Sequence, residues 1–242
     1  MAVYRNDPDL TLLGQCSNEE LQLLVSILST DPRDGDTRWT ESLTATPEFR
    51  LLAPDHRRYW QLIAGELQRY GANSLASLVR LGQGVTYREI LVDVCDKLDV
   101  NYNQKSTTET IELALLMKVL EKSLDQMTPE ELAAFSRNMH LDLTNPTPQL
   151  ILIAVQAAIR TSSLAAIELA TMLSASVITS LGGIATWGTV VVASRALSVL
   201  AGPFAIALSS AWMISDLAGP AYRVTIPACI IVSWLRQQHL SR

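Results

Sequence analysis

The sequence predicts an all-α protein, a bundle of many helices, and three observations support this fold class. Apolar residues recur at helical spacing along almost the whole chain. No run alternates apolar and polar residues as a half-buried strand would. Two helix starts are clear: Ser17 is followed by Glu20, and Thr128 is followed by Pro129 and Glu131. In such a capping box the hydroxyl accepts from an amide of the first turn while the glutamate reaches back to the capping residue.

The first part of the chain is expected to form about six short helices. The helix that starts after Ser17 carries Leu21, Leu24, Val25 and Leu28 on one face, and an acidic, turn-rich linker follows at residues 31–36. Gly71 is expected to end the next helix. The expected helices after the linker are about 56–70, 74–81, 86–98, 106–127, and one that begins at Thr128.

The second part differs in composition, and we expect a boundary near Pro146. Residues 1–145 hold 14 Lys/Arg and 22 Asp/Glu, a net charge of -8, whereas residues 146–242 hold 5 and 2, a net charge of +3. Asn-Pro-Thr-Pro at 145–148 is typical of a hinge, because each proline disfavours helix at the residue before it. The chain is therefore divided into a polar, acidic helical part, 1–145, and an apolar, weakly basic helical part, 146–242.

Two long spans without charge in the second part allow two interpretations. The spans cover 26 residues between Glu168 and Arg195 and 20 residues from 196 to 215, and about 20 residues suffice to cross a bilayer core. Small residues at four-residue spacing, such as Ala166, Ala170 and Ser174, let helices approach closely. A membrane hairpin is one interpretation. The other is a set of buried helices, of about 32, 18 and 15 residues and a last one at 222–239, since Gly182-Gly183, Gly202-Pro203 and Gly219-Pro220 divide the stretch.

Composition and motifs argue against catalysis and against nucleic acid. The acidic first part lacks the basic surface that phosphate backbones require. No zinc-protease, phosphate-loop or nucleophile-elbow motif is present, so no enzyme activity, cofactor or metal is predicted. The three cysteines have no metal-type spacing and are expected to be reduced, buried thiols. The histidines His56, His140 and His239 are expected to be solvated or to cap helices.

An acidic stripe and several arginines are the candidate interaction residues. Glu89, Asp93 and Asp96 recur at helical spacing on one face of the 86–98 helix, which favours a solvated or protein-docking surface over a metal site. Four arginines lie among aromatic and apolar neighbours and are expected to pair with Glu66, Glu89 or Asp93 and so lock helices together. These arginines are Arg57, Arg58, Arg88 and Arg223.

Three longer motifs resemble one bacterial family. They are His-Arg-Arg-Tyr-Trp-Gln-Leu-Ile-Ala-Gly-Glu-Leu-Gln at 56–68, Tyr-Arg-Glu-Ile-Leu-Val-Asp-Val at 87–94, and Ala-Tyr-Arg-Val-Thr-Ile-Pro-Ala at 221–228. Together with the stretch 9–28, they resemble the YaaW-like family of uncharacterised helical proteins. The middle region is similar to the helical domain of ubiquinol-cytochrome c chaperones. The resemblance implies a helical fold and a chaperone-like role class, and it carries over no catalytic residues.

Two functional hypotheses follow. In the first, the chain is a membrane-active protein whose polar helical part shields an apolar helical hairpin. When the bundle opens, residues 169–194 and 196–215 become exposed, enter anionic lipid and form a pore. In the second, a soluble chaperone-like or protein-interaction module keeps the apolar helices as its core and meets a protein partner. Both place the chain in the cytoplasm, the first also at the inner membrane, because no signal peptide opens the sequence. Small-residue helix faces also favour homo-oligomers.

Overall fold

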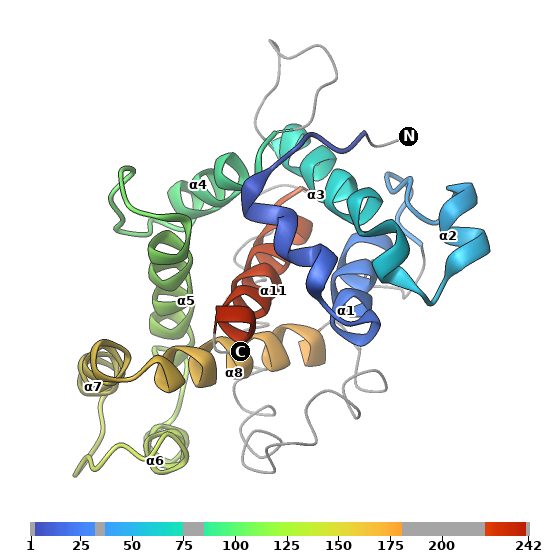
Figure 1. Ribbon diagram of the computed structural model, residues 1–242. Coiled ribbons are helices and arrows are strands. Elements are labelled where there is room, and N and C mark those ends of the chain that lie inside the picture. Colours follow the sequence, from blue (N-terminus) through green and yellow to red (C-terminus); the bar gives the residue numbers. More distant parts are fainter. Residues whose placement is uncertain (1–2, 32–36, 75–84, 181–220, 241–242) are drawn as a thin grey trace.

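A central helix surrounded by shorter ones defines the architecture (Figure 1). The computed structural model describes residues 3–31, 37–74, 85–180 and 221–240. Within these residues the fold is all-α, as predicted, and the strand-like pairing is an isolated antiparallel bridge between Thr30 and Thr37. The central helix is α11 (Tyr222–Leu240), and it packs against η1, α1, α3, α4, α5 and α8.

The N-terminal elements precede residue 100, and most of them pack against α11. They are η1 (Pro8–Gln15), α1 (Asn18–Ser29), α2 (Pro47–Leu52), η2 (His56–Tyr59), α3 (Trp60–Ser74) and α4 (Tyr87–Lys97). The capping box of Ser17 and Glu20 is present at the start of α1, and the predicted apolar face of that helix is buried. A further capping box joins Thr86 to Glu89 at the start of α4.

The helices that follow are α5 (Thr108–Leu124), α6 (Pro129–Asn138), α7 (Pro148–Thr161) and α8 (Ser163–Ser180). Thr128 and Glu131 form the predicted capping box of α6, with Pro129 in its first turn. α5 packs against both α7 and α8, and α8 in turn packs against α11. The small residues of α8 are buried there, and Ser174 Oγ lies 3.5 Å from the carbonyl oxygen of Ile230 on α11.

Gly71 does not end a helix, which corrects one expectation from the sequence. α3 continues to Ser74, and its predicted first turn, 56–59, is the 3₁₀ helix η2. A Cβ atom at Gly71 would lie 2.3 Å from Cγ1 of Ile90 on α4. Glycine is therefore present because α3 and α4 approach closely, and not because the backbone turns there. The helix expected at 74–81 lies outside the described residues from 75 onward.

A break at Ser162 corrects the single long helix expected after Pro148. Ser162 adopts an extended backbone with φ −148° and ψ 126°, and its hydroxyl accepts from the amide of Leu164. Thr161 donates to the carbonyls of Ala157 and Ala158. Hydroxyl side chains offer the backbone partners that compete with helix continuation, so the stretch divides into α7 and α8.

The expected boundary near Pro146 coincides with a turn, and the core extends across it. Asn145 has a positive φ of 54°, and Thr147 caps the first turn of α7. Buried residues from both sides of the boundary nevertheless belong to one hydrophobic cluster, in which α11 contributes residues of the second part. Composition changes at Pro146, while packing is continuous through α11.

The predicted hairpin residues Gly182, Gly183, Arg195, Gly202 and Pro203 lie outside the described residues. Glu168 is on the exposed face of α8. In the part of the chain that the structure describes, no helix combines the length and the apolar character needed to cross a membrane.

Candidate functional site

A buried polar network fixes the central helix from several sides. Glu112 of α5 is fully buried, and its carboxylate accepts from Tyr87 Oη at 2.8 Å and from Arg236 Nε at 2.8 Å. Arg236 also donates to the carbonyl oxygen of Asp9 at 2.8 Å, which ties α11 to η1. The Asp7 carboxylate accepts from the Tyr87 amide at 2.6 Å. Four segments therefore meet at one set of hydrogen bonds around α11.

Burial shifts the acidity of this network. It raises the pKa of Glu112 to about 7, although Arg236 and the Tyr87 hydroxyl lower it. Burial likewise raises the pKa of Tyr87 well above its ordinary value. Burial is the largest single effect on Arg236 and lowers its pKa, but Glu112, Tyr87 and Asp9 together outweigh it and raise the pKa of Arg236. Because these polar groups bond to one another and to the backbone of η1, we interpret the network as a structural lock.

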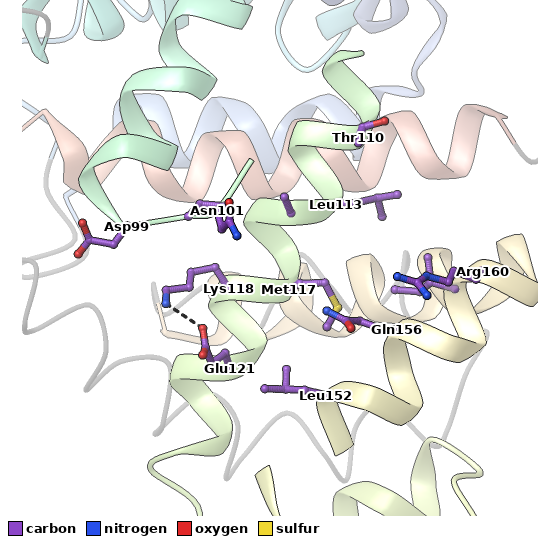
Figure 2. A pocket seen from close by; sticks show the side chains of 13 residues that line it. Asp99, Asn101, Thr110, Leu113, Met117, Lys118, Glu121, Leu152, Gln156 and Arg160 are labelled. Carbon is purple, nitrogen blue, oxygen red and sulfur yellow. Dashed lines mark ion pairs between the residues drawn. The ribbon is translucent and has the colours of Figure 1, made fainter. Parts of the chain in front are cut away.

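A pocket between α5 and α7 is the candidate functional site (Figure 2). Its volume is about 600 Å³, and it opens to solvent. The apolar walls come from Leu113, Ala114 and Met117 of α5 and from Leu152 and Ile159 of α7. The size and lining lie in the range of binding pockets, about 300–1,000 Å³ with mostly apolar walls. These side chains are only half-buried, so an occupant could cover apolar surface that the fold leaves accessible.

Charged and polar side chains form the rim of this pocket. Figure 2 shows Asp99 and Asn101 on one side and Arg160 and Gln156 on the other. Lys118 and Glu121 form an ion pair at 2.8 Å on the rim. Asp99 and Arg160 are exposed and form no ion pair among the described residues. The rim therefore presents an unneutralised anion and an unneutralised cation on opposite sides of an apolar floor.

An exposed apolar stripe lies beside the pocket on α7. Leu150 is 44% exposed and Ile153 is 64% exposed, while Ile151 and Val155 on the same helix are buried. Leu164, at the start of α8, is 65% exposed. α7 carries no acidic residue, and its polar side chains before the final threonine are Gln149, Gln156 and Arg160. α7 is thus apolar on most of its surface, although only one side packs into the core.

The predicted acidic stripe is largely engaged within the protein. Glu89 accepts from the amide and hydroxyl of Thr86, and Arg5 lies 3.5 Å from it. Asp93 accepts from Tyr222 Oη of α11 at 3.1 Å. Asp96 accepts from Tyr102 Oη at 2.6 Å. The structure therefore gives Glu89 and Asp93 internal roles, and whether the stripe also docks a partner stays a prediction.

The predicted arginine locks need correction in their pairing. Arg57 and Arg58 are exposed, and neither forms an ion pair among the described residues. Glu66, their expected partner, is buried and pairs with Arg69, because Arg69 lies one turn further along the same helix.

The other two predicted arginines lie at helix ends. Arg88 of α4 donates to the carbonyl oxygens of Gln104 and Ser106, both at 2.7 Å, and so joins α4 to the start of α5 without a carboxylate. Arg223 lies half-buried in the first turn of α11. None of the four predicted arginines lines the pocket or belongs to the buried polar network as described above.

His56 is buried, which corrects the expectation that it is solvated. Its ring nitrogens lie 2.5 Å from Tyr59 Oη and 2.7 Å from Gln22 Oε1, and burial lowers its pKa. The three cysteines are free and buried, as predicted. No group of three His, Cys, Asp or Glu side chains that could hold a metal ion occurs among the described residues.

Sequence reasoning missed both the lock and the pocket. Arg236 and Glu112 are 124 residues apart, so no local spacing links them. One signal for the pocket was available: residues 148–161 are apolar on all sides at helical spacing, more than one packing face requires.

Comparison with known proteins assigns a family. The chain is 41% identical to a UPF0174 protein of Helicobacter pylori strain J99 over 236 residues, which cover 96% of this chain and 92% of the relative. It belongs to the UPF0174 family. Another UPF0174 protein of that strain is 36% identical over 82% of this chain and 97% of its own length. The UPF0174 protein YaaW of Escherichia coli strain K12 is 32% identical over 97% of this chain and 95% of its own length.

Two family models match parts of this UPF0174 chain. Residues 55–231 match the model described as ubiquinol-cytochrome C chaperone, and residues 4–39 match a domain of unknown function, DUF3944. The resemblance predicted from the motifs is thereby confirmed. No solved structure matches the chain.

Proposed function

We propose that this UPF0174 protein is a protein-interaction module with a chaperone-like role, which holds an apolar segment of a partner protein in the pocket between α5 and α7. The observation that carries the proposal is the pocket itself, about 600 Å³ with apolar walls that the fold leaves partly accessible. The match of residues 55–231 to a chaperone family model supports the role class.

The chemistry of the walls suits apolar side chains of varied shape. Met117 is unbranched and polarizable, so it adapts to different neighbours. Leu113, Leu152 and Ile159 supply the remaining apolar surface. Burying an apolar side chain of a partner here contributes about 1.5–3 kcal/mol, so a few such contacts suffice for measurable affinity.

Binding of an unfolded client tests this proposal. A reduced and carboxymethylated globular protein remains unfolded and can be labelled for fluorescence anisotropy. We expect the full chain to bind it and the Leu152→Asp variant to bind at least about tenfold more weakly, because a carboxylate in an apolar wall loses hydration when a client covers it. Leu51→Asp is the matched control, since Leu51 is 82% exposed on α2, away from the pocket (Figure 1).

Two results would contradict the proposal. One is that the unchanged protein fails to bind the unfolded client. The other is that Leu152→Asp and Leu51→Asp bind it equally well while both variants keep the melting temperature of the parent.

Membrane association is a second candidate, which the two charge-free spans and the exposed stripe on α7 favour. An apolar helix face with Arg160 and without acidic residues suits an anionic lipid surface. For pore formation, residues 169–177 of α8 would have to leave α11, because Leu169, Ala170 and Leu173 are buried there.

Flotation with anionic phosphatidylglycerol vesicles separates the two candidates. Membrane activity predicts that the protein floats with the vesicles and releases an entrapped dye at some pH between acid and neutral. If it neither floats nor releases dye anywhere in that range, the membrane candidate is lost.

A further inference from the structure

The walls of the pocket determine what kind of backbone an occupant can have. Both long walls are helices, α5 and α7, whose backbone groups bond within their own helices. No strand edge borders the pocket in the described residues, so the walls offer no row of amides and carbonyls to an extended chain. A partner segment must then satisfy its own backbone hydrogen bonds as apolar surface is covered, and an α-helix does so.

The floor of the pocket accepts one apolar face of such a helix. Met117 points from α5 towards α7, between Leu113 above and Leu152 below in Figure 2. Ala114, which has a short side chain, lines the pocket on the α5 side beside these residues. Apolar side chains spaced three and four residues apart on a partner helix would meet this floor, while the opposite face would remain in solvent.

The rim adds a charge requirement. Asp99 lies on the loop that leads into α5, and Arg160 lies near the end of α7, on opposite sides of the floor. Asp99 has a positive φ of 55°, and its backbone amide donates a hydrogen bond to the carbonyl oxygen of Asp96 at 3.3 Å. Its carboxylate and the Arg160 guanidinium form no ion pair among the described residues, so both are available to opposite charges on an occupant.

We propose that the occupant of this pocket is an amphipathic helix of a partner protein that carries a cation at one end, facing Asp99, and an anion at the other, facing Arg160. The inference rests on the proposed function and specifies its ligand. The apolar face supplies affinity, and the two charges select among apolar helices.

Peptides with the same apolar face and different ends test the inference. Each has about 15 residues, near the length at which an isolated helix becomes stable. One peptide carries Lys at one end and Glu at the other, a second carries Lys at both ends, and a third carries Glu at both ends. A fourth scrambles the first, so that its apolar residues no longer share a face. Dissociation constants are measured on the full chain by fluorescence anisotropy at low salt.

The unchanged protein is expected to bind the mixed-charge peptide about fivefold more tightly than either uniform peptide, the size expected when one exposed pair changes from attraction to repulsion. Arg160→Glu makes both sides of the rim acidic and is expected to transfer the preference to the peptide with Lys at both ends. Asp99→Asn, which tolerates the positive φ, is expected to remove the preference for the mixed-charge peptide over the peptide with Glu at both ends. Arg57→Glu is the control, since Arg57 is exposed outside the pocket, and it should change nothing.

The outcomes separate this inference from the proposed function. If the peptides bind equally and Leu152→Asp weakens all of them, the pocket holds apolar segments without selecting charge, and the inference is overturned while the proposed function stands. If the scrambled peptide binds as well as the mixed-charge peptide, the helical occupant is overturned. If neither the peptides nor the unfolded client bind, both proposals fail. Binding to lipid vesicles, without binding to the peptides or to the unfolded client, would contradict the proposal that the partner is a protein.

Discussion

Glu112 lies between a phenol and a guanidinium in the middle of the bundle, and this position makes the fold sensitive to pH. Its carboxylate bonds Tyr87 and Arg236, and burial raises its pKa to about 7. The groups that face it are Tyr87 of α4, Glu109 of its own helix, and Arg236 and Cys229 of α11. Since the unfolded chain has a Glu112 pKa of 4.5, the folded state holds this proton over a wider pH range.

The Glu112→Gln variant tests whether this buried carboxyl makes the stability of the fold depend on pH. Between pH 4.5 and about 7 the folded state binds more protons at Glu112 than the unfolded state does, so its contribution to stability is complete below 4.5 and is lost as pH rises through 7. Each pKa unit is worth about 1.4 kcal/mol, so the free energy of unfolding should fall by about 3 kcal/mol over that window. Glu112→Gln should remove this part of the pH dependence.

Urea unfolding of both proteins from pH 4 to 8 measures this pH dependence, with Glu121→Gln, whose side chain is 43% exposed, as the control. Identical pH profiles for the parent and Glu112→Gln would contradict the assignment.

The residues that sequence reasoning identified correctly act within a few positions of each other. Ser17 and Thr128 were predicted as caps because a cap and its glutamate are three residues apart. The Glu112–Arg236 pair and the buried His56 were not predictable in this way, because their partners come from other helices. Arg57 and Arg58 were expected to pair with carboxylates, yet exposed charges find adequate partners in water.

At the scale of elements, the close approach of α3 and α4 depends on Gly71. The sequence correctly placed α1, α4, α5, α6 and α11 because each has a clear apolar face or cap, with ends within a few residues. Gly71 was misinterpreted, since a glycine that ends a helix and one that admits a neighbouring helix look alike in sequence. The same applies to the stretch after Pro148, where Ser162 interrupts a continuously apolar run.

Gly71→Ala tests this explanation of the α3–α4 contact. The added methyl would lie 2.3 Å from Ile90 Cγ1, and relief of such overpacking typically costs about 1–3 kcal/mol. In an Ile90→Ala background the same change should cost less, because the two nearest atoms, Cγ1 and Cδ1 of Ile90, are gone and only Val85 Cγ2 at 2.9 Å remains close. Free energies of unfolding for the four proteins of this double-mutant cycle give the coupling. An equal cost in both backgrounds would show that the contact does not explain the glycine.

At the scale of the whole molecule, the last helix of the chain lies at its centre. Contacts of α11 reach residues far away in sequence, such as Asp9, which is 227 residues from Arg236. Periodicity showed that residues 222–239 are apolar and helical, yet it could not show which helices surround them. The pocket was unpredictable for the same reason: it exists only where α5 and α7, separated by α6, come together.

Methyl NMR spectra can show directly whether the pocket between α5 and α7 binds an apolar helical segment. The full chain, labelled at Met, Leu and Ile methyl groups, is titrated with the mixed-charge peptide. We expect the methyl signals of Met117, Leu113, Leu152 and Ile159 to shift together and saturate, while those of Leu51 and Met139, outside the pocket, stay in place. Saturating shifts elsewhere, or no shift at these four residues, would contradict it.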